Sequence, residues 1–130
     1  MDIIEALQDL QTVKSVAAGM TRRRNDVYVL MTEIYRIGRK WLNRGVSRAL
    51  RDAILEHEKV RVDRRTTRKV FRFLIELTCS LDTKLKSRYA NAMEYARLRD
   101  CPATELTEFL KKDGIEKSAK KYIAHRKNHA

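Results

Sequence analysis

The sequence predicts an all-α protein, and three observations support this prediction. Apolar residues recur at the three- and four-residue spacing of helices along the whole chain. Four Gly and one Pro are too few for a protein rich in strands and turns. No pair of alternating segments flanks the kind of short turn that joins two hairpin strands. We therefore expect one compact domain over residues 1–130, with six or seven helices and a helix-turn-helix-like hairpin near its C-terminus.

Two amphipathic helices are predicted before residue 46. Gly19 and Gly45 follow them and are typical of helix C-termini. Asn25 or Asp26 is expected to cap the second helix, because the three arginines at 22–24 would oppose the helix dipole inside a first turn. The apolar positions are Ile3, Leu7, Leu10, Val13 and Ala17 in the first helix, and Val27, Leu30, Met31, Ile34, Gly38 and Trp41 in the second.

Five further helices are predicted after residue 46. Ser47, Asp63 and Asp82 are typical N-cap residues and mark the starts of the third, fourth and fifth helices. The fourth is expected to continue as one helix to about residue 81. Pro102 breaks the chain and suits the first turn of a sixth helix. A seventh helix follows Gly114, and the tail at 125–130 is expected to fray. The apolar positions of the fourth helix are Val70, Leu74, Leu77 and Leu81.

The excess positive charge lies in two blocks of the chain. The net charge is +12, with 29 basic and 17 acidic residues. Residues 1–20 form an acidic and apolar N-terminal helix, whereas 22–81 form a basic helical body and 82–127 a C-terminal three-helix unit. Residues 22–72 alone hold 16 Lys and Arg against 6 Asp and Glu, and residues 109–130 hold 7 against 2. Such concentration favours a polyanionic partner over a merely solvated surface, which would intersperse both signs.

The fourth helix is predicted to present one basic face. At 100° per residue, five basic residues fall on the side opposite the apolar positions, and no acid accompanies them. Two of them lie in the first turn, where a bound phosphate would offset their repulsion from the helix dipole. The alternative is an ordinary solvated face. The residues are Arg64, Arg65, Arg68, Lys69 and Arg72.

The second helix is predicted to add a second basic face, preceded by three arginines. Tyr28 and Tyr35 lie at the border of this face, where they could contact a phosphate or stack on an unpaired base. The alternative for each tyrosine is a border residue with its hydroxyl in water. The basic residues are Arg22, Arg23, Arg24, Arg36, Arg39, Lys40 and Arg44.

The C-terminal segment is consistent with a helix-turn-helix unit, with a turn at Gly114. In that interpretation the last helix contacts DNA, and its N-terminal half exposes polar side chains. The alternative is a plain helical hairpin with a solvated lysine face. The side chains expected to be exposed are Glu116, Lys117, Ser118, Lys120 and Lys121.

Catalytic and metal-binding patterns are not evident in the sequence. Cys79 and Cys101 lack the short spacing of zinc or redox sites. His125 and His129 have the spacing of a metal pair but no neighbouring carboxylate or thiolate. We expect no enzyme, cofactor or metal, and two free thiols. The N-terminus lacks the basic segment of an export signal and no apolar run is long enough to span a bilayer, so we expect a cytoplasmic protein without membrane contact.

These patterns predict a small nucleic-acid-binding protein, a regulator or accessory factor that docks on double-stranded DNA through arginine-rich helix faces. Two alternatives stay open, namely an interaction module for an acidic protein and an RNA-binding protein. A homodimer through the apolar first helix would double the basic surface. In the opposing interpretation this helix folds back onto its own domain. Its apolar residues are Ile3, Ile4, Leu7, Leu10, Val13 and Val16.

Overall fold

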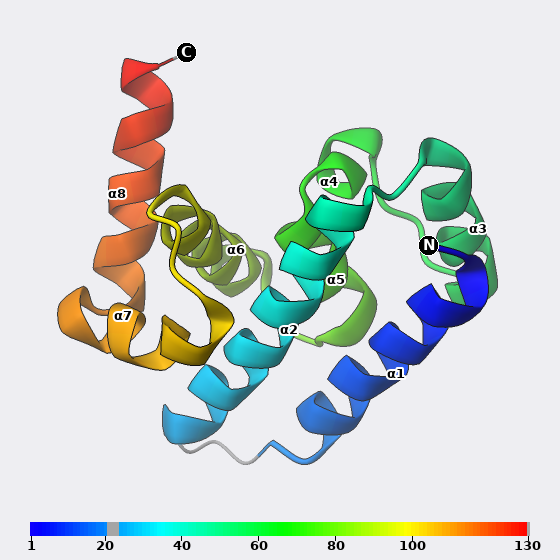
Figure 1. Ribbon diagram of the computed structural model, residues 1–130, viewed down its shortest axis with the longest axis horizontal. Helices are drawn as coiled ribbons and strands as arrows, with labels where there is room; N and C mark the ends of the chain where they lie inside the picture. Colours follow the sequence, from blue (N-terminus) through cyan, green and yellow to red (C-terminus); the bar gives the residue numbers. More distant parts are fainter. Residues whose placement is uncertain (21–23, 130) are drawn as a thin grey trace. The chain divides into compact units, whose positions relative to one another are not determined.

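The computed structural model describes residues 1–20 and 24–129, with only the backbone of Arg24 (Figure 1). Every regular element in these ranges is a helix, which confirms the predicted all-α class. The contacts divide the chain into unit 1, Met1–Ser80, and unit 2, Leu81–Ala130. The one-domain organisation stays a prediction. The elements are α1 (Ile3–Ala18), α2 (Arg24–Arg44), α3 (Arg48–Glu58), α4 (Arg64–Arg68), α5 (Val70–Thr78), α6 (Thr83–Leu98), the 3-10 helix η1 (Ala103–Glu105), α7 (Leu106–Asp113) and α8 (Ile115–Asn128).

The core of unit 1 lies between α1, α2 and α5, with α3 against α1 (Figure 1). Tyr35 of α2 stacks on Phe71 of α5, with ring centroids 5.4 Å apart and ring planes 18° from parallel. Gly38 lets the two helices approach closely, because a Cβ atom at this position would lie 2.5 Å from Cε1 of Phe71. The fully buried side chains also include Leu10, Met31, Ile34, Ile37, Trp41, Ile54, Phe73, Leu74 and Ile75.

The apolar face of α1 folds back onto its own unit. Ala6, Leu10 and Val13 are buried there, whereas Ile4 is 65% exposed. Of the six apolar residues that suggested a dimer, Leu10 and Val13 therefore belong to the core of the same chain, whereas Ile3, Leu7 and Val16 are half-buried. Dimerization through α1 stays a prediction.

Three predicted N-caps are confirmed. Ser47 Oγ accepts a hydrogen bond from the Leu50 amide at 3.1 Å, and Asp63 Oδ1 accepts one from the Thr66 amide at 2.8 Å. Asp82 caps α6 in the same way. Gly45 has a φ of +76°, in the left-handed region that glycine adopts without steric cost, and it follows α2 as expected.

The start of α2 differs from the prediction. The helix begins at Arg24, so Asn25 and Asp26 lie inside its first turn and neither is the N-cap. The repulsion between arginines and the helix dipole was expected to delay the start. Asp26 places a negative charge in the first turn, which offsets that repulsion.

The predicted fourth helix is interrupted at Lys69, where the backbone is extended with φ −97° and ψ 99°. The Lys69 amide bonds to the carbonyl of Thr66, three residues back, which closes α4 after five residues. Thr67 is buried and its hydroxyl donates to the Arg64 carbonyl at 2.9 Å. Such side-chain bonds to the backbone compete with the regular helical ladder. The second piece, α5, ends at Thr78, before the predicted limit at residue 81.

Unit 2 is built on α6 and α8, which pack along one another, with α7 against both. Ala90 and Ala96 keep this face of α6 narrow, and Met93 fills the core between them. Pro102 precedes η1, so the sixth predicted helix begins with a 3-10 turn. The last helix continues to Asn128, and the predicted fraying from residue 125 is therefore wrong. None of the helices in the described part of the chain combines the length and apolar character needed to cross a bilayer.

Candidate nucleic-acid interface

The basic residues near the C-terminal end of α2 pair with acidic residues of α1. Lys40 Nζ lies 2.8 Å from Glu5 Oε2 and 2.9 Å from Asp9 Oδ2. Arg44 Nη1 is 2.8 Å from the same Glu5 oxygen. The hydrogen bond from Lys40 lowers the pKa of Glu5, and the bond to Glu5 raises the pKa of Lys40. The acidic first helix therefore neutralises part of the predicted basic face.

The other two basic residues of this face have partners within α2 itself. Arg36 forms an ion pair with Glu33, one helical turn away. The Arg39 guanidinium lies 5.7 Å from the centre of the Tyr35 ring and donates to the Tyr35 hydroxyl at 3.3 Å. Tyr28 and Tyr35 are buried, with exposed fractions of 6% and 0%, so the suggestion that they stack on bases is wrong. The Tyr35 ring stacks on Phe71 of α5 in the core.

The break at Lys69 separates Arg72 from the other predicted residues of the fourth helix. Arg72 belongs to α5, its side chain is 17% exposed, and its Nε lies 3.0 Å from Glu76 Oε1. The predicted continuous five-residue face is therefore wrong. In one continuous helix, Arg72 would lie on the same face as Arg64 and Arg68. Because the helix is interrupted at Lys69, Arg72 instead belongs to the mostly buried α5, where it pairs with Glu76.

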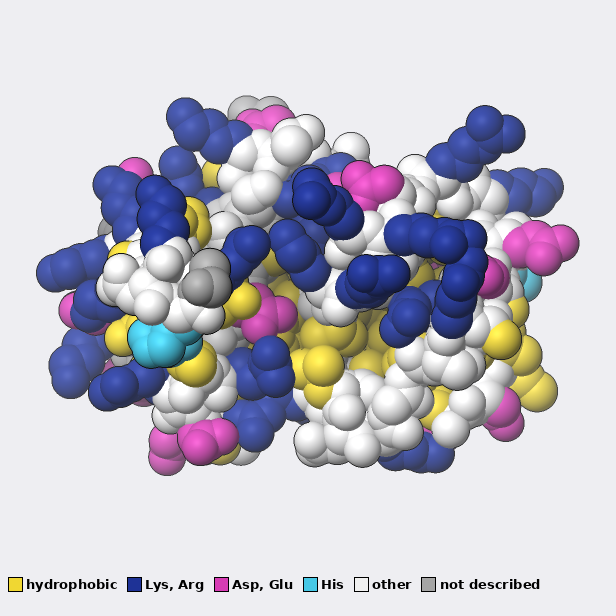
Figure 2. Space-filling view, turned by 90° about the horizontal axis from the view of Figure 1, so that it is seen from above, with side chains coloured by type: hydrophobic (Ala, Val, Ile, Leu, Met, Phe, Trp, Pro, Cys, Tyr) yellow, Lys and Arg dark blue, Asp and Glu magenta, His cyan; other side chains and the backbone are white. Residues whose placement is uncertain are grey.

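Four basic residues stay together and exposed, and we refer to them as the α4 basic cluster. Within the described part of the chain, none of them forms an ion pair. Figure 2 shows Lys and Arg side chains gathered beside an apolar hollow on its right side. The cluster consists of Arg64, Arg65, Arg68 and Lys69.

The N-terminus of α4 does not offer the phosphate site that the sequence suggested. The helix has only five residues, and the Asp63 carboxylate already accepts the Thr66 amide at 2.8 Å. This bond is the largest cause of the lowered pKa of Asp63, and the charge of Arg65 contributes to it. The cluster therefore has to act through its side chains rather than through free backbone amides.

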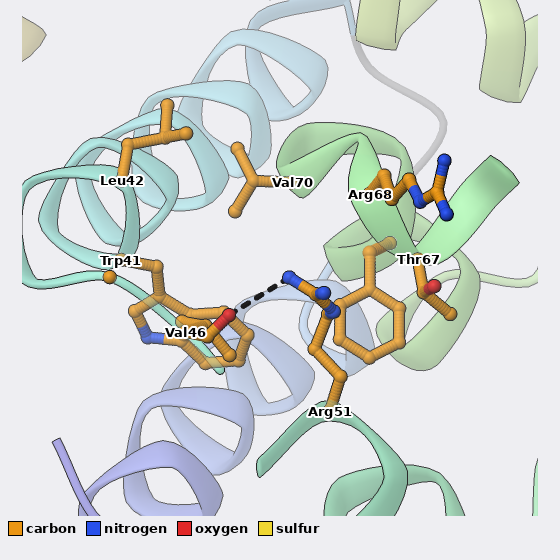
Figure 3. A pocket seen from close by; sticks show the side chains of 9 residues that line it. Trp41, Leu42, Val46, Arg51, Thr67, Arg68 and Val70 are labelled. Carbon is orange, nitrogen blue, oxygen red and sulfur yellow. Dashed lines mark hydrogen bonds between the residues drawn. The ribbon is translucent and has the colours of Figure 1, made fainter. Parts of the chain in front are cut away.

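A cavity of about 110 Å³ lies beside the cluster, within unit 1 (Figure 3). Its walls are mostly apolar, and the lining also includes two arginines, Arg51 and Arg68. Arg51 donates to the Val46 carbonyl at 2.8 Å, which holds its guanidinium in place (Figure 3). Sequence reasoning missed both Arg51 and the cavity. The sequence shows Arg51 one helical turn after Arg48. It does not show the cavity, because the apolar walls come from three segments that are separate in the sequence. The apolar lining residues are Trp41, Leu42, Val46, Val70 and Phe73.

Two of the predicted residues of the last helix lie elsewhere than expected. Ser118 is 1% exposed, because it lies on the face of α8 that packs in unit 2. Lys121 forms an ion pair with Asp113 of α7, and this bond raises the pKa of Lys121. Lys117 and Lys120 are exposed as predicted. The prediction that the N-terminal half of the last helix exposes these polar side chains is therefore wrong for Ser118. For Lys121 it is confirmed only in part, because this side chain is partly exposed but paired with Asp113.

The structure describes no side chain of the three predicted arginines at positions 22–24. Arg22 and Arg23 lie outside the described residues, and only the backbone of Arg24 is described. Cys79 is half-buried and Cys101 is buried, and neither forms a disulfide bond among the described residues. Among the described residues, no three His, Cys, Asp or Glu side chains come together in a way that could hold a metal ion.

Comparison with family models, with curated proteins and with solved structures finds no match for this chain.

Proposed function

We propose that the protein is a cytoplasmic regulator or accessory factor that binds double-stranded DNA through the α4 basic cluster. One observation carries the proposal: four exposed cations lie within six residues without an ion pair among the described residues. Three of the four are arginines, whose planar guanidinium groups suit two-point contact with phosphate oxygens. Their positive charge would attract the DNA backbone irrespective of its sequence.

The structure favours a duplex over single-stranded RNA as the partner. Recognition of single-stranded RNA relies on aromatic side chains that stack on unpaired bases. Tyr28 and Tyr35 were the aromatic residues beside a predicted basic face, and both are buried. Contacts to a duplex need only the charged side chains that the cluster exposes. On α8, the exposed Lys117 is the candidate for additional contacts from unit 2, whereas Lys120 already lies 3.5 Å from the Glu116 carboxylate.

The salt dependence of binding tests this proposal. Each neutralised phosphate contributes about −0.9 to the slope of log K against log salt concentration, so four contacts give a slope near −4. The test variant replaces all four cluster residues with Gln, and fluorescence anisotropy with a labelled duplex measures both affinity and slope. We expect the variant to lose most of the slope while its circular dichroism is unchanged, because the four side chains are exposed.

A control variant matched in charge separates a local site from general attraction. It replaces four exposed lysines of unit 2 with Gln and so lowers the net charge by the same amount. We expect it to retain most of the affinity and slope. Equal losses in the two variants would show that only the net charge matters and would contradict a site on α4. The four control positions are Lys84, Lys111, Lys112 and Lys127.

A further inference from the structure

We propose that the cavity beside the α4 basic cluster is a docking site for an acidic peptide segment that inserts one aliphatic side chain. The proposal goes beyond DNA binding and does not depend on it. It rests on three properties of the cavity, which are its apolar walls, its size and the charge around it.

The walls of the cavity are apolar and fixed. Trp41 is 1% exposed, and its indole Nε1 donates to Asp9 Oδ2 at 2.9 Å, which holds the ring in place. Phe73 lies against it, with ring centroids 6.5 Å apart. Leu42, Val46 and Val70 complete the apolar lining (Figure 3). Covering apolar walls of this kind with hydrocarbon is favourable, and the charged phosphates that the α4 basic cluster would bind do not provide such a surface.

The size of the cavity favours a single side chain. Sites for cofactors and other small molecules commonly enclose about 300–1,000 Å³. The volume here is about 110 Å³. It is smaller than the cavity of about 150 Å³ that admits a benzene molecule in a well-studied engineered protein. One aliphatic side chain fits these dimensions, and protein interfaces concentrate binding free energy in such anchor residues.

The charge around the cavity determines what flanks that side chain. Arg51 is anchored by one hydrogen bond to the Val46 carbonyl, and an arginine has further N–H donors available for a carboxylate. Arg68 is exposed and forms no ion pair among the described residues. If a neutral or basic peptide covered the cavity, Arg51 and Arg68 would be partly removed from water without gaining a negatively charged partner. Acidic residues on either side of the aliphatic anchor would pair with them.

Peptide binding to the wild-type protein tests the proposal. The probes are acetylated heptapeptides of Asp and Glu with a central Leu or a central Ser, and a third peptide with Leu flanked by Lys. Trp41 is the only tryptophan and lines the cavity, so its fluorescence reports insertion directly. We expect the acidic Leu peptide to bind at least tenfold more tightly than the Ser peptide, a difference of about 1.4 kcal/mol. Only the Leu peptide should change the Trp41 emission.

Substitutions then locate the contact. Arg68→Gln should weaken binding of the acidic Leu peptide severalfold, whereas Lys127→Gln in α8 removes an exposed charge of unit 2 and should leave it unchanged. Equal binding of the Leu and Ser peptides would overturn the proposal, because attraction would then be electrostatic alone. Binding of the Lys-flanked peptide as tightly as the acidic one would overturn the charge argument. A duplex DNA that changes Trp41 emission as the Leu peptide does would assign the cavity to nucleic acid instead.

Discussion

Replacing Gly38 with Ala should destabilise unit 1, although the same change in most helices is stabilising. Gly38 lies within α2, and Ala is favoured over Gly in a helix interior by about 1 kcal/mol. At this position, however, the new methyl group would lie 2.5 Å from Cε1 and 2.6 Å from Cδ1 of Phe71. The Phe71 ring cannot swing aside freely, because it is completely buried and stacked on Tyr35.

The magnitude follows from these two opposing effects. Overpacking a well-filled core costs about 1–3 kcal/mol, and the helix preference returns about 1 kcal/mol. We expect a net loss of about 1 kcal/mol in the free energy of unfolding. Gly19→Ala is the matched control. Gly19 has a φ of −83°, and the nearest atoms to its added Cβ lie at 3.6 and 3.7 Å, so this change should stabilise the protein by about 0.4–1 kcal/mol.

Urea denaturation followed by Trp41 fluorescence measures both variants. Trp41 is the only tryptophan and belongs to unit 1, so the signal reports unfolding of that unit. The close approach also predicts coupling, since Phe71→Leu removes the atoms that the new methyl group meets. The loss of unfolding free energy in the double variant should therefore be smaller than the sum of the losses in the two single variants, by at least about 0.5 kcal/mol. Stabilisation by both Gly38→Ala and Gly19→Ala, without coupling to residue 71, would refute the packing of α2 against α5.

Substitutions at three further positions test the polar contacts of the two units. Asp9→Ala should cost about 1–3 kcal/mol, because it leaves the buried indole N–H of Trp41 without its acceptor, and Asp9→Asn should recover part of the loss in urea titrations. Glu5 has a lowered pKa in the folded state, so its contribution is present above its unfolded pKa of about 4.3 and lost as the pH falls through the folded value. Stability should therefore decline less steeply below pH 5 in Glu5→Gln than in the wild type. Ser118→Ala should raise the melting temperature of unit 2, since the buried Ser118 hydroxyl has no hydrogen-bond partner among the described residues.

The sequence was sufficient to predict the helical class and most helix ends, because these depend on local chemistry. Ser and Asp are common N-cap residues before an apolar helical pattern. The structure has Ser47, Asp63 and Asp82 in that role. The break at Lys69 was not predicted. It depends on the burial of Thr67 and on the path of α5 through the core, and neither is visible in a helical projection.

The candidate site was predicted only in part, because charge counted along a chain does not show which charges pair in space. The residues of α2 appeared as a basic face until Glu5 and Asp9 of α1, more than 30 positions away, were found opposite Lys40. The cavity was invisible for a similar reason, since its walls come from α2, the segment after it and the α4–α5 region. Arg68 alone among the predicted cluster residues also lines that cavity.

The distribution of ion pairs explains why α4, rather than the whole basic block, is the stronger candidate for a binding surface. An exposed cation that already has a carboxylate partner loses that partner when it binds a phosphate, so the net gain is small. Lys40 and Arg44 are in this position, because Glu5 bonds to both. The cations of α4 have no such partner among the described residues, and an incoming anion displaces only water and salt ions. The same reasoning holds for a phosphate backbone and for an acidic peptide, and the adjacent apolar cavity is the feature that distinguishes the two, because only a peptide gains from filling it.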